Sequence, residues 1–169
     1  AVGGLGTLPN TTELVVLRQD GDGWRRVDAP IALPGARAVS CAAVDDCLVL
    51  GAFSGLDLRY RDGLLTVLPG AALDTRWGAG AVDCAPGGGC LRTDGAASAW
   101  WDGDGWSDPV PLPAGMMRDT QQLSCASETS CLLVATEPGI EGWPTPGNVT
   151  STTWDGTAWS PVVTLDHDT

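Results

Sequence analysis

Lysine is absent from the 169-residue sequence, which has 21 acidic residues and a formal net charge of −12. A surface this acidic repels the phosphates of nucleic acids and of anionic membranes, so neither is an expected partner. No apolar run approaches the length that crosses a bilayer, which excludes a predicted transmembrane helix. Cations and basic protein surfaces are the partners that this charge favours.

Histidine and tyrosine are equally scarce, each occurring once, as His167 and Tyr60. With the histidine near the end of the chain and the cysteines in pairs, the sequence offers no Ser–His–Asp or Cys–His catalytic set. The abundant acids leave a two-carboxylate glycosidase as an alternative, but most of them lie in predicted turns. The sequence therefore favours a protein that is not an enzyme.

Long periodic segments are missing as well, because 23 glycines and 12 prolines interrupt the chain. No window keeps a helical period, whereas short apolar stretches such as 13–17, 47–50 and 131–134 have the composition of strands. Asp-Gly pairs between such stretches predict hairpins. Hydrophobic residues make up 43% of the chain, so we expect one all-β domain with its own core.

The six cysteines form three pairs with the same spacing, C-x5-C. Zinc sites use closer pairs and add histidine, so an oxidising compartment and disulfides are favoured. Six cysteines allow about fifteen connectivities, and the repeated spacing favours the three short loops. Each loop would stabilise the fold by roughly 2 to 2.5 kcal/mol. The predicted disulfides are Cys41–Cys47, Cys84–Cys90 and Cys125–Cys131.

Each cysteine pair belongs to a longer repeat with a period of about 40 residues, as in propeller blades. An apolar residue and a small polar residue precede the first cysteine, and a leucine follows the second. A second element then reads Arg61-Asp62-Gly63, Trp101-Asp102-Gly103 and Trp154-Asp155-Gly156. A tryptophan closes the last two elements, and the element also occurs once before the first cysteine pair, at Asp20–Trp24.

This pattern resembles the repeats of secreted propeller-type proteins of actinobacteria, often described as sialidase-like. The D-G-x-x-W element is also similar to the Asp-box of sialidase-type propellers, but it lacks the residue between Asp and Gly. The resemblance implies a β-propeller-like array of about four small blades with disulfide-pinned hairpins. It transfers no catalytic residues, because neither an arginine triad nor a tyrosine–acid pair is identifiable.

The repeats divide the single domain into a partial unit, 1–38, and three complete units, 39–81, 82–122 and 123–169. One cysteine hairpin is missing between the last unit and the first. A four-bladed ring with a defective seam, a partner chain and a larger parent protein each account for this gap. We expect self-association or a protein partner to complete the array.

Tryptophans at repeated positions are expected to pack between blades, as in Trp24, Trp106 and Trp159. Two further tryptophans do not repeat and lie in predicted loops, where they could stack on a sugar ring or simply cover the core. These two, with the charged residues near them, are the candidate ligand-binding residues: Asp74, Arg76, Trp77, Glu141 and Trp143.

Two D-G-D-G segments place pairs of carboxylates close together, Asp20 with Asp22 and Asp102 with Asp104. Such pairs could begin a calcium site, but Asp and Gly are also ordinary turn residues, and further ligands at fixed offsets are missing. No other cofactor is expected. The sequence predicts a secreted or cell-surface binding or scaffold module that engages another protein chain or a carbohydrate. The alternative is a sialidase-like enzyme or a fragment of one.

Overall fold

The computed structural model describes the following parts of the chain: 16–27, 36–51, 56–69, 73, 80–116, 120–136 and 148–165. Every regular element in these parts is a β-strand, so the predicted all-β class is confirmed. None of them contains a helix long and apolar enough to cross a membrane. The strands form one two-stranded hairpin and three four-stranded sheets, each antiparallel and in simple sequential order.

The N-terminal hairpin pairs β1 (Val16–Asp20) with β2 (Gly23–Val27). The first sheet consists of β3 (Ala36–Ala43), β4 (Asp46–Gly51), β5 (Asp57–Arg61) and β6 (Leu64–Leu68). The second sheet consists of β7 (Val82–Cys84), β8 (Cys90–Thr93), β9 (Ala97–Trp101) and β10 (Val110–Pro111). The third sheet consists of β11 (Thr120–Ser127), β12 (Ser130–Thr136), β13 (Val149–Trp154) and β14 (Val163–Leu165).

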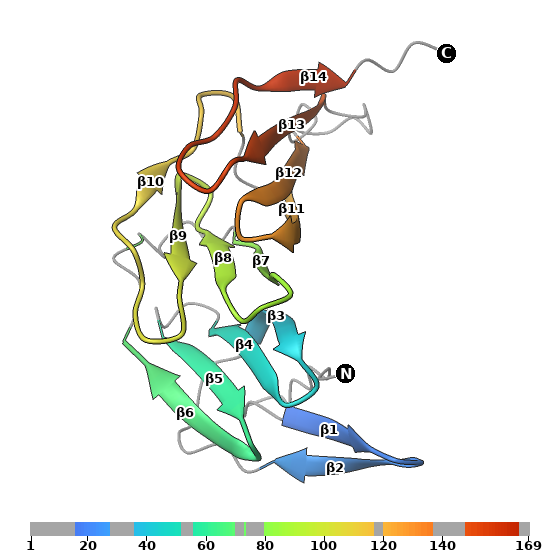
Figure 1. The fold of residues 1–169 in the computed structure, drawn as a ribbon. Coiled ribbons are helices and arrows are strands. Elements are labelled where there is room, and N and C mark those ends of the chain that lie inside the picture. The colour runs from blue at the N-terminus through green and yellow to red at the C-terminus, as the bar shows by residue number, and fades with distance from the viewer. Residues whose placement is uncertain are drawn as a thin grey trace, which may run out of the picture.

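The sheets follow one another along an arc, like neighbouring blades of a propeller (Figure 1). The first strands of the three sheets lie side by side on the inner side of the arc, with β7 in contact with both β3 and β11. Later strands of each sheet lie progressively farther from this inner edge (Figure 1). The predicted propeller-like array of small blades is therefore observed.

A disulfide joins the first two strands of every four-stranded sheet. The bonded pairs are Cys41–Cys47, Cys84–Cys90 and Cys125–Cys131. In each case the two cysteines lie directly opposite one another in the antiparallel ladder, with Cα atoms 3.9, 3.9 and 4.0 Å apart. The disulfide-pinned hairpins expected from the repeated spacing are therefore present.

The Asp-Gly turns differ between the sheets. Asp62 and Gly63 form a two-residue turn with φ values of 51° and 84°, the left-handed geometry that favours Asn, Asp and Gly. In the second sheet a longer loop separates Trp101 from Trp106, which still pair across it. Relative to the cysteines, Tyr60 therefore occupies the position of Trp101, because Tyr60 pairs with Cys47 as Trp101 pairs with Cys90. The sequence repeat, in which Arg61-Asp62-Gly63 matches Trp101-Asp102-Gly103, predicts Arg61 at the position of Trp101, which is wrong by one residue.

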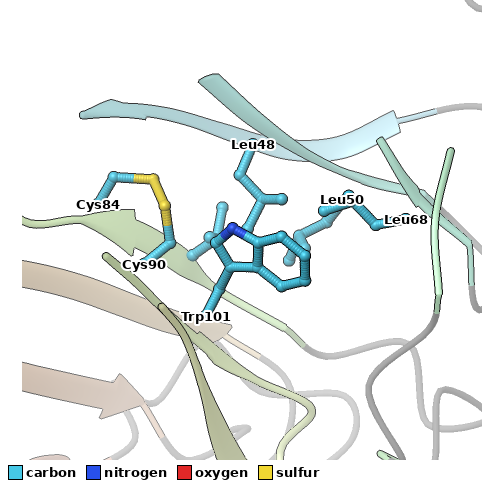
Figure 2. Close-up of a cluster of buried hydrophobic side chains, with 7 residues drawn as sticks. Leu48, Leu50, Leu68, Cys84, Cys90 and Trp101 are labelled. Atoms are coloured by element: carbon cyan, nitrogen blue, oxygen red, sulfur yellow. A yellow bond between two sulfur atoms is a disulfide. The ribbon is translucent and has the colours of Figure 1, made fainter. Parts of the chain in front are cut away.

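The two faces of each sheet have different neighbours. We call the face that carries the cysteines the front face and the opposite one, which carries the leucine after the second cysteine, the back face. The back face of the first sheet packs on the front face of the second, and Figure 2 shows Trp101 lying against Leu48 and Leu50. The back face of the second sheet packs in turn on the front face of the third. The core thus lies between sheets.

Candidate functional site

Tryptophan pairs on the front faces fill the spaces between sheets. The ring centroids of Trp101 and Trp106 lie 5.4 Å apart, and those of Trp154 and Trp159 are also 5.4 Å apart. Each pair packs on the sheet before it, in agreement with the expected packing role. Trp24 differs, because 54% of its surface is exposed. No sheet described here precedes the N-terminal hairpin and covers it.

A buried ion pair joins the first sheet to the second. Asp57 lies on the back face of the first sheet and accepts a hydrogen bond from Arg92 on the front face of the second. The two side chains are 1% and 5% exposed. Burial raises the pKa of the Asp57 carboxyl, and the charge and hydrogen bond of Arg92 oppose that rise. The pair fixes one sheet against the next at a site closed to solvent.

Neutral hydrogen bonds join the second sheet to the third. Trp159 Nε1 donates to Ser98 Oγ over 2.9 Å, and Thr93 Oγ1 donates to Gln121 Oε1 over 2.6 Å. Ser98 occupies the ladder position that Asp57 holds in the first sheet, since each lies three residues before the aromatic partner of the second cysteine. The same repeat position therefore serves both contacts between sheets, with different chemistry.

A third set of bonds joins the inner edges of the sheets, where the first strands meet. Ser40 Oγ donates to Asp83 Oδ1 over 2.6 Å and accepts the Cys84 N–H over 3.0 Å. Asp83 Oδ2 accepts the Cys125 N–H over 2.7 Å. Ser40 and Asp83 are the small polar residues that precede the first cysteine of their units. The third such residue, Ser124, is exposed.

One small recess lies at the contact between the first and second sheets, lined by Asp46, Leu48, Arg59, Gly88, Cys90 and Trp101. Its charged groups are already paired, because Arg59 Nη2 lies 2.7 Å from Asp46 Oδ2 and Arg59 Nη1 donates to the Gly103 carbonyl over 2.8 Å. The hydrogen bond from Arg59 lowers the pKa of Asp46. The recess therefore has a structural explanation within the chain.

The predicted carboxylate pairs lie at turns. Asp102 Oδ1 accepts the N–H groups of Asp104 and Gly105, each over 2.9 Å, and these bonds lower the pKa of Asp102, that from Gly105 most. Asp22 lies in the exposed turn of the N-terminal hairpin, and nothing is described of the Asp20 side chain. Within the described parts of the chain, no group of three or more metal-ligating residues is found. A calcium site at these turns stays a prediction.

The other predicted ligand residues lie outside the described residues. They are Asp74, Arg76, Trp77, Glu141 and Trp143. A binding role for these two loops therefore stays a prediction too.

The surface that the sequence did not single out is the back face of the third sheet. The leucine after the second cysteine is buried in the first two sheets, at 2% exposure for Leu48 and 0% for Leu91, but Leu132 is 44% exposed. Leu132 belongs to a face of the third sheet that we call the open face, made of Gln122, Ser124, Leu132, Val134, Thr136, Val149, Ser151, Thr153, Val163 and Leu165. The repeated Cys-Leu pair was visible in the sequence, but which of the three leucines is exposed was not.

No protein-family model matches the chain, and no curated protein matches it. Among solved structures, the chain is similar to the propeller protein in "YCF48 bound to D1 peptide", with a TM-score of 0.56 and 11% sequence identity. The match covers 86% of this chain and 46% of that chain, so this chain spans about half the length of YCF48. At this identity the likeness shows the propeller-like fold alone.

Proposed function

We propose that this chain is an extracellular scaffold module without enzymatic activity, and that it binds another polypeptide on the open face of the third sheet. The observation that carries the proposal is the contrast between Leu132 and its equivalents. Leu48 and Leu91 are buried by a following sheet, and Leu132 has the same place in the repeat but is exposed. A sheet face with exposed apolar side chains is typical of protein-binding surfaces.

The chemistry of the open face favours a polypeptide over a charged ligand. The apolar surface comes from Leu132, Val134, Val149, Val163 and Leu165, and the remaining residues of the face are neutral and polar. Such a surface matches the apolar centre and polar rim of protein interfaces. The solved YCF48 structure, which has the same kind of fold, is bound to a peptide, and this supports the proposal. The three disulfides support an extracellular location.

The test is selection of short random peptides on the intact wild-type protein, followed by affinity measurements on two variants. Leu132→Asp places a charge on the open face and should weaken the selected peptides by about tenfold or more. Leu64→Asp is the matched control, because Leu64 is 69% exposed on the first sheet. It should leave peptide affinity unchanged.

Three results would overturn the proposal. One is the absence of any peptide that binds the wild-type protein, and another is equal binding to the Leu132→Asp variant. The third is saturable binding or turnover of a glycan in an array, dependent on Trp77 or Trp143, which would support the carbohydrate alternative. Circular dichroism of each variant checks that the sheets remain folded.

A further inference from the structure

The N-terminal hairpin exposes the surface that complements the open face. Trp24 pairs with Gln19 across its turn as Trp106 pairs with Trp101 and Trp159 pairs with Trp154. Trp24 is therefore the hairpin's copy of the tryptophan that packs on a preceding sheet. In the two later copies that packing is observed, whereas Trp24 is 54% exposed. The N-terminal hairpin thus presents an exposed tryptophan at this repeat position.

The open face repeats the residues that receive such a tryptophan elsewhere in the chain. Trp159 binds Ser98 Oγ, and Ser98 pairs with Val110 at the outer part of the second sheet. In the third sheet the same ladder positions are held by Ser151 and Val163, which also pair with one another. Val110 is half-buried in the core beneath the third sheet, but Val163 is 56% exposed. The open face therefore repeats the serine and valine of an observed contact.

We infer that a second copy of this chain docks its N-terminal hairpin on the open face, with Trp24 Nε1 of one copy donating to Ser151 Oγ of the other. The contact continues the arrangement already present between the second and third sheets. It rests on the proposed function, because it names the polypeptide that the open face binds. The contact is head-to-tail, so repeated docking closes a ring or extends a chain.

Charge favours this head-to-tail contact over two open faces stacked on each other. The hairpin segment 16–27 contains three arginines and two aspartates. The described parts of the third sheet, 120–136 and 148–165, contain the acids Glu128 and Asp155 and neither arginine nor lysine. Docking the hairpin on the third sheet brings opposite net charges together. Stacking two third sheets would bring two acidic sheets together, which is unfavourable. Association should accordingly weaken as salt rises.

The experiment measures mass in solution by sedimentation velocity over a range of concentrations, for the intact chain and two end-blocking variants. The wild-type protein should form multiples of its 17.4 kDa mass. Trp24→Asp blocks the hairpin end and Val163→Asp blocks the open face, so each variant alone should remain monomeric. A mixture of the two should form a dimer and nothing larger, because one intact hairpin end and one intact open face remain. Leu64→Asp should associate like the wild type.

A wild-type protein that stays monomeric at every concentration would overturn the inference. So would a mixture of the two variants that fails to pair, because two identical faces in contact would give that result. Peptide selection tests whether the open face binds a polypeptide and does not require self-association. It therefore separates the proposed function from the proposed contact between two copies. Peptides that bind the open face of a strictly monomeric protein would leave the proposed function standing and remove only self-association.

Discussion

The two contacts between neighbouring sheets share one geometry but use different chemistry. Between the first and second sheets, the repeat position on the back face holds Asp57, which pairs with Arg92. Between the second and third sheets, the equivalent position holds Ser98, which accepts a hydrogen bond from Trp159. A charged pair and a neutral bond thus serve equivalent places in one array.

This difference shows what the repeat requires at that position. A buried carboxylate is tolerated only with a cation facing it, because an unpaired buried charge is very unfavourable. A serine needs only a donor, which the repeated tryptophan supplies. The stability of the first contact should therefore depend on pH and should fall sharply when one charged partner is removed. The second contact contains no charged group at this position, so its stability should not depend on pH there.

The largest expected effect comes from breaking the charged contact. Arg92→Met leaves Asp57 buried without its cation and should lower the free energy of unfolding by about 3–5 kcal/mol, measured by denaturant titration at neutral pH. The double variant Asp57→Asn with Arg92→Met removes the charge as well and should recover part of that loss. Equal stability of the two variants would show that charge does not decide this contact.

The free energy of unfolding of the Arg92→Met variant should also depend strongly on pH. Burial raises the pKa of Asp57 above its usual 3.8, so the folded protein binds the proton more tightly than the unfolded chain does. Stability at this site is therefore greatest below pH 3.8 and falls as pH rises through the raised pKa. Without Arg92 the pKa of Asp57 rises further, because the charge and hydrogen bond that lower it are lost.

Denaturant midpoints of wild type and Arg92→Met should therefore converge as pH is lowered towards the usual pKa of an aspartate. A constant difference between the two proteins from neutral to acidic pH would contradict a buried charge at Asp57.

A smaller effect is expected at the inner edge. Ser40→Ala removes the acceptor of the Cys84 N–H and the donor to Asp83, and should lower the free energy of unfolding by about 1–2 kcal/mol. Ser124→Ala changes the same repeat position where the side chain is exposed, and should shift stability by less than about 0.5 kcal/mol. Thermal unfolding of both variants checks this, and similar losses would show that the inner bonds do not hold the sheets together.

Among the three contacts between sheets, the smallest loss is expected where Trp159 of the third sheet binds Ser98 of the second. Trp159→Phe keeps an aromatic ring but loses the bond to Ser98, which should lower the free energy of unfolding by about 1 kcal/mol. Trp106→Phe is the control, because Trp106 Nε1 is buried without a partner among the described residues. Both substitutions shrink the ring, so the difference between their unfolding free energies reports the bond. A larger loss in Trp106→Phe would contradict this assignment.

Much of the fold followed from the sequence because its signals are local. Identical cysteine spacing predicted the three disulfides, and Asp-Gly pairs predicted hairpins, since both depend on residues a few positions apart. The equivalence of Tyr60 with Trp101 was missed, because the two-residue turn at Asp62 shifts the motif by one residue relative to the ladder. Only the strand register relative to the cysteines reveals it.

The candidate surface followed from the sequence much less. The pairing of Asp57 with Arg92 joins residues 35 positions apart, and no local pattern marks them as partners. The exposure of Leu132 and Trp24 was equally hidden, since both residues match repeat positions that are packed in the other units.

The sequence by itself determined which residues are equivalent, because each unit repeats the same apolar, polar and turn positions and closes its own short loop. Which of those equivalent residues become buried was decided by tertiary structure alone. Burial depends on a neighbouring sheet being present, and that is a property of the assembled array rather than of any single repeat.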